Sequence, residues 1–446
     1  MSLFSTKIFK KHIIINFLFS SLIVSFIAGN LVLNANVLLI IATSFFFYKE
    51  RIVKFDFDNF DKILIFLFLY ILLCGLLNNV SYYKNSLTDD FSVFLKSLFF
   101  LRFLFFYFVV KFLIKENIIN FKVFFIISFA SVTFVSLDII YQLIFGYDIF
   151  GFKGVERRLS GPFGDELIAG SFIQRFSLIS LFLIPVFFKF KNNYTRNFLT
   201  ILLILLFFIA LLLSGNRVPL VFFILTVIGV TIFEQKIRIF LMPFIFIVFS
   251  IIFLAYNMNE GYREHLHSFT KKTVQIFLPF SSKNLLTSDD EKKYKNYQFY
   301  TFEYKGKKYK LPNSHVKEFK TGYVTWLDKK LFGGGVKSFK INCPEAKTIN
   351  CGSHPHNYYL DILTSLGVLG FLIILILFSS IFIKTFFEKY FKKSNLNNFH
   401  LITPFIFLFF AEIFPIKSTG SFFSTGNATY IFLLLSIIIP LSKVKN

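Results

Sequence analysis

The chain has 446 residues, of which 55% are hydrophobic and 71 are Phe, and its formal net charge at pH 7 is +23. This composition excludes an ordinary soluble domain, because runs of about 18 or more apolar residues are typical of membrane-spanning helices. Many Lys and Arg residues lie in short segments between the apolar runs, a pattern typical of a cytoplasmic membrane face. We therefore expect a polytopic membrane protein in contact with membrane lipids, and no nucleic acid partner.

The apolar runs predict an all-α membrane protein with about twelve transmembrane helices. The first run follows a basic start and has no convincing cleavage site, so we interpret it as an uncleaved helix. We expect nine spans within residues 1–256, one large periplasmic loop at 257–355, and three spans within 356–446. The candidate spans are approximately 13–29, 31–48, 63–77, 91–110, 123–144, 166–188, 198–213, 218–233, 239–256, 357–383, 400–416 and 427–442.

The distribution of charge predicts the orientation of these spans. Connections that carry Lys and Arg alternate with connections that carry fewer, and the basic set belongs on the cytoplasmic side. Segment 146–165 is basic and is the exception among the short loops of the opposite set. This pattern predicts that both termini are cytoplasmic and that the large loop is periplasmic.

The large loop contains predicted elements of its own. Two short segments, Tyr297–Tyr304 and Lys307–Leu311, are predicted as the strands of a β-hairpin with its turn at Lys305-Gly306. Apolar residues at helical spacing in Val316–Leu331 predict a helix that ends at the glycine run from Gly333. Cys343 and Cys351 form a disulfide if the loop faces an oxidising compartment, and otherwise stay free. No full ligand set stands at zinc spacing, so no metal site is expected.

The segment Ser353–Leu360 marks the return of the large loop to the membrane. Proline suits the first turn of a helix, so we predict a helix that starts at Pro355 with His356 in its first turn. The helix dipole there favours a neutral imidazole, which can accept a proton at neutral pH. Gly367 and Gly370 would lie deeper on the same face, where small residues allow close helix packing. Alternatively, His354 and His356 are only polar residues at a membrane interface.

Several cations could bind phosphate groups. Arg217 follows a Ser-Gly-Asn break between two short spans, and Arg158 lies in a Gly/Pro-rich turn. The planar guanidinium binds phosphate oxygens in pairs, so either residue suits a lipid diphosphate. In the alternative interpretation both residues contact lipid headgroups. Lys96 lies near the outer end of its span and is a further candidate.

Arg102 and Arg175 lie deeper in their predicted spans. A charged residue in hydrocarbon is costly, and it usually has a partner or a function. The two arginines either line a polar cavity or pair with Asp138 or Glu412, and we favour pairing.

The run His354-Pro355-His356-Asn357, with Gly367 and Gly370 behind it, resembles the signature of the O-antigen ligase and O-antigen polymerase superfamily. Trp326-Leu327 and Gly333-Gly334-Gly335-Val336 resemble the lead-in to that signature. Arg158 and Arg217 match its arginine-bearing turns, although Asp165-Glu166 stands where the family often has Pro-Asn.

The resemblance implies transfer of a glycan from an undecaprenyl-diphosphate carrier to a hydroxyl acceptor at the bacterial inner membrane. It implies no cofactor, no nucleotide sugar and no required metal. In this interpretation His356 is the general base, and Arg217, Arg158 and Lys96 bind the diphosphate. Asn357 and Gly367 would support the site.

The single large outer loop, with only a modest loop at 146–165, favours a ligase whose acceptor is lipid A core. A polymerase, whose acceptor is another glycan repeat, is the alternative within the superfamily. A flippase or transporter of lipid-linked sugars is the alternative from another class. It would also use membrane arginines, but it would not need a long outer loop that opens onto a histidine.

Overall fold

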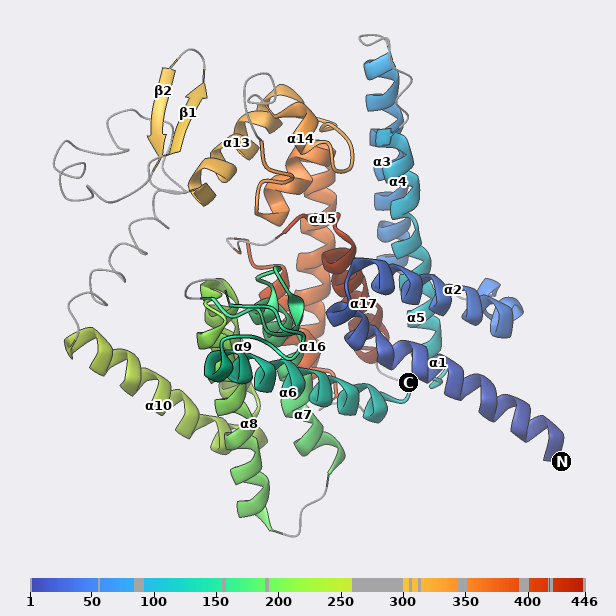
Figure 1. Cartoon of the computed structure of the whole chain (residues 1–446). Coiled ribbons are helices and arrows are strands. Elements are labelled where there is room, and N and C mark those ends of the chain that lie inside the picture. Colours follow the sequence, from blue (N-terminus) through green and yellow to red (C-terminus); the bar gives the residue numbers. More distant parts are fainter. Residues whose placement is uncertain are drawn as a thin grey trace.

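The computed structural model describes residues 2–54, 57–83, 92–154, 158–188, 192–258, 300–304, 307–311, 314–343, 351–392, 401–415, 417 and 420–443. Almost all of this part is helical (Figure 1). Its buried Phe, Ile, Leu and Val side chains form one hydrophobic core.

The helices of the first half follow one another with short connections. They are α1 (Ser2–Ala28), α2 (Asn30–Val53), α3 (Asn59–Tyr83), α4 (Ser92–Phe100), α5 (Arg102–Lys115), α6 (Phe121–Phe145), the 3-10 turn η1 (Gly161–Phe163), α7 (Ala169–Phe187), α8 (Asn193–Leu213), α9 (Arg217–Phe233) and α10 (Gln235–Met258). The second half contains β1 (Tyr300–Tyr304), β2 (Lys307–Leu311), α13 (Ser314–Asp328), α14 (Phe339–Asn342), α15 (Tyr358–Tyr390), α16 (Thr403–Glu412) and α17 (Thr425–Leu441).

The polytopic helical architecture is confirmed. In the part of the chain that the structure describes, eight helical segments are long and apolar enough to cross a membrane, and four shorter apolar helices accompany them. The shorter ones are Arg217–Phe233, Leu241–Ser250, Thr403–Glu412 and Thr425–Leu441.

The span predicted at 91–110 is divided into α4 and α5 by a tight turn at Leu101. There the Leu101 N–H donates to the Leu98 carbonyl at 3.1 Å, in place of a regular helical bond. The Arg102 guanidinium donates to the Phe99 carbonyl at 2.6 Å, which satisfies a carbonyl at the end of α4. The apolar segment Ser92–Lys115 still has the length of one span.

The central element is α15, which runs through the middle of the molecule (Figure 1). It packs against α3 on one side, and α3 in turn packs against α4. It also packs against α16, and α16 packs against α9. In Figure 1, α4 lies to the right of α15 and α9 lies to its left.

The predicted elements of the large loop are confirmed where the structure describes them. Strands β1 and β2 form an antiparallel pair in which Tyr300 faces Leu311 and Tyr304 faces Lys307. Residues 297–299 of the predicted first strand, and the turn at Lys305-Gly306, lie outside the described residues. Helix α13 covers most of the helix predicted at Val316–Leu331. Cys343 and Cys351 are joined by a disulfide.

The predicted start of the tenth span is corrected. Helix α15 begins at Tyr358, and Asn357 is its N-cap, because the Asn357 side chain accepts hydrogen bonds from the N–H groups of Tyr359 and Leu360. His356 precedes the cap and has a φ of 55°, in the left-handed region. His356 is therefore not in a helical turn. The prediction that it lies in the first turn of α15, where the helix dipole favours a neutral imidazole, is wrong.

The role predicted for Gly367 is also corrected. Its φ of 68° and ψ of −171° interrupt α15. A Cβ atom at this position would lie 2.1 Å from the Leu331 carbonyl oxygen. Glycine is therefore needed for the backbone conformation and for the approach of another backbone, rather than for helix–helix packing.

Candidate active site

Two imidazole rings lie side by side just before α15. The ring centroids of His354 and His356 are 4.3 Å apart. His354 Nδ1 lies 2.8 Å from the Ser353 hydroxyl, and its Nε2 is buried without a hydrogen-bond partner. Burial lowers the pKa of His354 below its ordinary value, because desolvation disfavours the charged form. This pair is a candidate for accepting a proton at neutral pH.

Asn357 fixes the backbone next to His356. Its side-chain oxygen caps α15, and its side-chain NH₂ donates to the carbonyls of Pro415 and Lys417 at 2.8 and 3.2 Å. Asn357 is only 5% exposed, so these groups are shielded from water. One side chain thus ties the start of α15 to the connection between α16 and α17.

Asp361 makes a second link to the same connection, one turn further along α15. Its carboxylate accepts hydrogen bonds from the Ser421 hydroxyl at 2.7 Å and from the Phe422 N–H at 2.9 Å. Together, Asn357 and Asp361 hold both ends of the described α16–α17 connection against the first turn of α15. His356 therefore sits on a rigid support.

A buried ion triad, formed by Arg175, Glu412 and Lys417, lies beneath this support. Glu412 is fully buried and accepts from Arg175 and Lys417, each at 2.6 Å. Arg175 also donates to Asn427 at 2.6 Å, and the Tyr358 hydroxyl bonds to Glu412. The predicted pairing of Arg175 with Glu412 is confirmed. The triad has one net positive charge close to the start of α15.

Arg217 is the first residue of α9, and its side chain is exposed. Phe222, five residues later, has the Lys417 ammonium over its ring at 5.6 Å. The Lys417 carbonyl in turn accepts from Asn357. Helix α9 and the segment that carries His356 therefore meet at Lys417. Five residues of helix span only about 7–8 Å along the axis, so Arg217 begins a helix that leads to this meeting point.

Arg158 is exposed and lies just before η1, in a turn that packs against α6. A Cβ atom at Gly161 would lie 3.0 Å from Ile139 and 3.7 Å from an Asp138 carboxylate oxygen. Asp138 accepts from the Ile149 N–H at 3.0 Å, and no ion pair with either Arg102 or Arg175 occurs among the described residues. The 3-10 turn η1, which begins three residues after Arg158, contacts α1, α6 and α7. The start of α7 in turn lies against the turn before Arg217, because a Cβ atom at Gly170 would be 2.7 Å from the Asn216 side chain.

The glycine run Gly333–Gly335 fills the interruption of α15. The N–H groups of Gly334 and Gly335 donate to the carbonyls of Thr364 and Ser365, each at 2.8 Å. These carbonyls lose their helical partners at the break, so the glycine run replaces part of the missing helix bonding. The glycine run and Gly367 thus act as one structural unit.

Lys96 lies on the other side of α15 from Arg217. It belongs to α4, which packs against α3, and its side chain is half-buried. The segment of Lys337 lies against α4, because a Cβ atom at Gly335 would be 2.3 Å from Val93, and both Lys96 and Arg102 act electrostatically on Lys337. The structure therefore groups Lys96 with two cations that were not among the predicted site residues.

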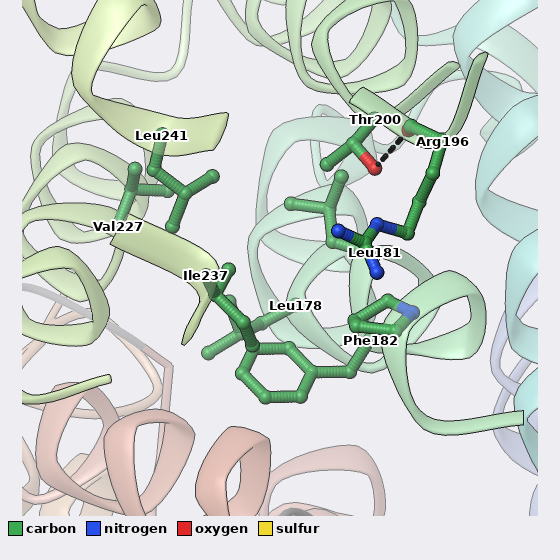
Figure 2. A pocket seen from close by; sticks show the side chains of 9 residues that line it. Leu178, Leu181, Phe182, Arg196, Thr200, Val227, Ile237 and Leu241 are labelled. Carbon is green, nitrogen blue, oxygen red and sulfur yellow. Dashed lines mark hydrogen bonds between the residues drawn. The ribbon is translucent and has the colours of Figure 1, made fainter. Parts of the chain in front are cut away.

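A small, mostly apolar pocket lies elsewhere, between α7, α8, α9 and α10 (Figure 2). In Figure 2 the Thr200 hydroxyl donates to the Arg196 carbonyl at 2.9 Å. The pocket contains no carboxylate or imidazole and none of the predicted site residues, so we do not assign the reaction to it. Its lining residues are Leu178, Leu181, Phe182, Pro185, Arg196, Thr200, Val227, Ile237 and Leu241.

Sequence reasoning missed Lys417, Asp361 and Lys337. Lys417 and Lys337 are single lysines in loops, and only the tertiary structure shows that they face charged neighbours. Asp361 is an acidic residue at the start of an apolar run. Such a residue usually has a partner or a function, so the sequence could have identified Asp361 as a candidate.

The sequence matches one protein-family model. Residues 202–375 match the model described as O-antigen ligase, and this range contains Arg217, His356, Asn357 and Gly367. Among curated proteins, none matches the chain.

Proposed function

We propose that this chain belongs to the O-antigen ligase and polymerase superfamily, because residues 202–375 match the model described as O-antigen ligase. From this premise we propose that the protein moves a glycan from an undecaprenyl-diphosphate carrier to a hydroxyl group of an acceptor. Lipid A core is the acceptor that we favour, at the periplasmic side of the bacterial inner membrane.

In the proposed reaction His356 acts as the general base. The acceptor hydroxyl oxygen forms a new bond to the anomeric carbon, and the bond between that carbon and the diphosphate oxygen breaks. The hydroxyl proton passes to an imidazole nitrogen of His356, and undecaprenyl diphosphate leaves with its negative charge. His354 supports this role, because burial lowers the pKa of His354 and its neutral ring does not oppose the protonation of His356 beside it.

The proposed role of Arg217 and Arg158 is to bind the departing diphosphate. Guanidinium groups stay charged in proteins and bind phosphate oxygens in pairs, so they stabilise the charge that develops on the leaving group. Lys96 was predicted for the same role, and that role stays a prediction. Lys96 also lies near Arg102 and Lys337, which are not among the residues predicted to bind the diphosphate.

The proposal also includes a topology of twelve spans, with the loop 257–355 on the periplasmic side and both termini in the cytoplasm. The eight long and four shorter apolar helices of the described residues are compatible with that number. In this orientation α4, α9 and α15 all begin at the periplasmic surface.

One observation carries the proposal. His356 and Arg217 lie in one O-antigen ligase domain, and the support of His356 and the helix begun by Arg217 meet at Lys417. A base and a phosphate-binding cation near the same point are what glycan transfer from a diphosphate carrier requires.

The test uses complementation of a deletion strain, with lipopolysaccharide banding as the readout. We expect His356→Asn and Arg217→Gln to abolish the ladder at normal protein levels. Asparagine tolerates a positive φ, so His356→Asn removes the base without new backbone strain. The control is Arg51→Gln, which should keep activity. Arg51 is an exposed arginine at the predicted cytoplasmic end of α2.

The banding pattern of the deletion strain distinguishes a ligase from a polymerase. Loss of the whole ladder in the deletion strain supports a ligase, and core with a single repeat supports a polymerase. If both His356→Asn and Arg217→Gln restore a normal ladder, the proposed chemistry is wrong.

A further inference from the structure

Three cations from separate segments gather on the α3–α4 side of α15: Lys96, Arg102 and Lys337. We call them the α4 cation group. Arg102 and Lys96 both act electrostatically on Lys337, and so does Asp361 of α15. Although Lys337 is exposed, partial desolvation lowers its pKa, Arg102 and Lys96 lower it further, and Asp361 opposes them.

No member of the group has a counterion within the described part of the chain. The Arg102 guanidinium donates to the Phe99 carbonyl and stacks on the Phe103 ring at 4.3 Å, but its Nε is buried without a partner. Asp361 acts electrostatically on Lys337, but its carboxylate already accepts hydrogen bonds from Ser421 and Phe422. In the described part of the chain, two ammonium groups and one guanidinium group therefore lie near one another without a carboxylate bonded to any of them, and this arrangement favours the binding of an anion.

The surroundings of the group are fixed rather than loose. Lys337 has a φ of 55° and follows Val336, which is 1% exposed. The preceding Gly335 bonds to α15, and a Cβ atom on it would lie 2.3 Å from Val93 of α4. Helix α4 thus touches the glycine run one turn before Lys96.

The other end of α4 touches the segment that holds Asp361. Phe100 packs against Phe423, with ring centroids 5.2 Å apart, and against Phe422 at 6.5 Å. Val93, Lys96 and Phe100 are spaced by three and four residues, so they share one face of α4. Lys96 therefore lies between two contacts on the face that meets the glycine run and the Asp361 support.

We propose that the α4 cation group binds a phosphate group of the acceptor glycolipid. The inference rests on the proposed function and adds the chemical class of the acceptor. A phosphate monoester has close to two negative charges at neutral pH and three strong acceptor oxygens, which match one guanidinium and two ammonium groups.

The direction of attack in the proposed reaction requires that the acceptor and the donor diphosphate bind at different places. The attacking hydroxyl and the departing oxygen lie on opposite faces of the sugar ring when the reaction is a single displacement. Arg217 begins α9, beyond α16, whereas the α4 cation group lies beyond α3. With His356 at the start of α15 between them, the donor diphosphate lies on the α9 side and the acceptor on the α4 side.

The experiment uses the full chain in vesicles of phosphatidylcholine, whose headgroup has no net charge. The donor is an undecaprenyl-diphosphate glycan, and the acceptor is a lipid A core glycolipid, either intact or treated with phosphatase. The variants are Arg102→Gln and Lys337→Gln, because Lys96 is also a candidate for binding the donor diphosphate. Lys340→Gln, an exposed lysine of the same segment outside the group, is the matched control.

For each group variant we expect the KM for the intact acceptor to rise about tenfold, which corresponds to about 1.4 kcal/mol. The KM for the donor should not change, and wild type and variants should be equal with the dephosphorylated acceptor. A rise in the donor KM instead would assign the group to the diphosphate. Equal losses with both acceptors would mean a structural role. Either result overturns the inference.

Binding without turnover separates failure of this inference from failure of the proposed function. The His356→Asn protein should bind the intact acceptor tightly, and adding Lys337→Gln should weaken that binding about tenfold, or about 1.4 kcal/mol. If binding responds in this way but the wild type transfers no glycan, the proposed function fails and the phosphate site stands. If phosphatidate competes as well as the acceptor and phosphatase treatment has no effect, the group binds membrane lipid and the inference is wrong.

Discussion

At the scale of single residues, Asn357 illustrates why the amide side chain matters next to His356. The oxygen caps α15, and the NH₂ group bonds to two carbonyls of the α16–α17 connection. Aspartate keeps the first function, because a carboxylate also caps helices well. It loses the second, because a carboxylate has no N–H to donate.

We therefore expect Asn357→Asp to destabilise the protein by about 2 kcal/mol or more, because a carboxylate would face two buried carbonyls. Asn120→Asp is the matched control. Asn120 caps α6 through its side-chain oxygen, and the residue is exposed, so the substitution should have little effect. Thermal unfolding in detergent measures both. Equal melting temperatures for the two variants would contradict this account.

The buried ion triad predicts an asymmetry between its members. Glu412→Gln leaves Arg175 and Lys417 buried without a carboxylate, whereas Arg175→Gln leaves Glu412 paired with Lys417. An uncompensated buried charge costs about 3–5 kcal/mol, so Glu412→Gln should lower the melting temperature much more than Arg175→Gln. The same detergent measurement tests this order, and the reverse order would exclude Glu412 as the centre of the triad.

At the scale of elements, the interruption of α15 is the main feature that sequence periodicity could not predict. The sequence around Gly367 reads as a continuous apolar helix, yet the glycine run Gly333–Gly335 bonds to the carbonyls that the break frees. The interruption therefore depends on a segment about thirty residues away in the chain.

Gly367→Ala tests this interpretation. An alanine in a left-handed conformation costs about 1–2 kcal/mol, and its Cβ would also meet the Leu331 carbonyl at 2.1 Å. We expect a marked loss of folded protein by fluorescence-detected size-exclusion chromatography. Gly426→Ala, in α17, is the control, because the nearest atom to its added Cβ is 3.8 Å away. If Gly367→Ala is as stable as this control, α15 is not interrupted in the folded protein.

The disulfide between Cys343 and Cys351 closes a short segment just before His354 and His356. It predicts a labelling pattern, because Cys74, the third cysteine, is free and buried. After denaturation without reductant, a polyethylene-glycol maleimide should add to one cysteine, and after reduction to three.

Blocking free thiols in intact cells with a small permeant maleimide before lysis is a control against disulfide exchange. Addition to three cysteines without reductant would mean that the disulfide does not form.

At the scale of the whole molecule, one ion network connects the C-terminal end to the first half of the chain. Asp58, between α2 and α3, accepts from Lys443 at 2.7 Å and from Lys111 at 2.6 Å. Lys111 also pairs with the buried Asp61. The ends of α5 and α17 and the start of α3 therefore meet at one face of the molecule.

This meeting predicts that the Lys54 connection and the C-terminus lie on the same side of the membrane. With the proposed topology, green fluorescent protein fused after Asn446 should fluoresce, and alkaline phosphatase fused after Lys54 should be inactive. Alkaline phosphatase fused after Leu311 should be active. Activity after Lys54 together with fluorescence after Asn446 would contradict the arrangement around Asp58.

The sequence predicted more of the fold than of the site. Long apolar runs identify membrane helices because hydrocarbon leaves the backbone few alternatives, and the short elements of the large loop follow local patterns. The sequence favoured an ion pair for both Arg102 and Arg175, because a charge in hydrocarbon usually has a partner. Among the described residues only Arg175 has one, Glu412. The start of α15 was misplaced, because the Asn357 cap outweighed the preference of Pro355 for a first turn.

By itself, the sequence determined that this chain is a many-helix membrane protein whose residues 202–375 match the model described as O-antigen ligase. Only the tertiary structure decided which charges meet. Lys417 joins Glu412, Lys337 joins Lys96 and Arg102, and α15 separates the α4 cation group from Arg217. The physical reason is that helix periodicity is a local property, whereas the neighbours of a charge depend on which distant helices pack together.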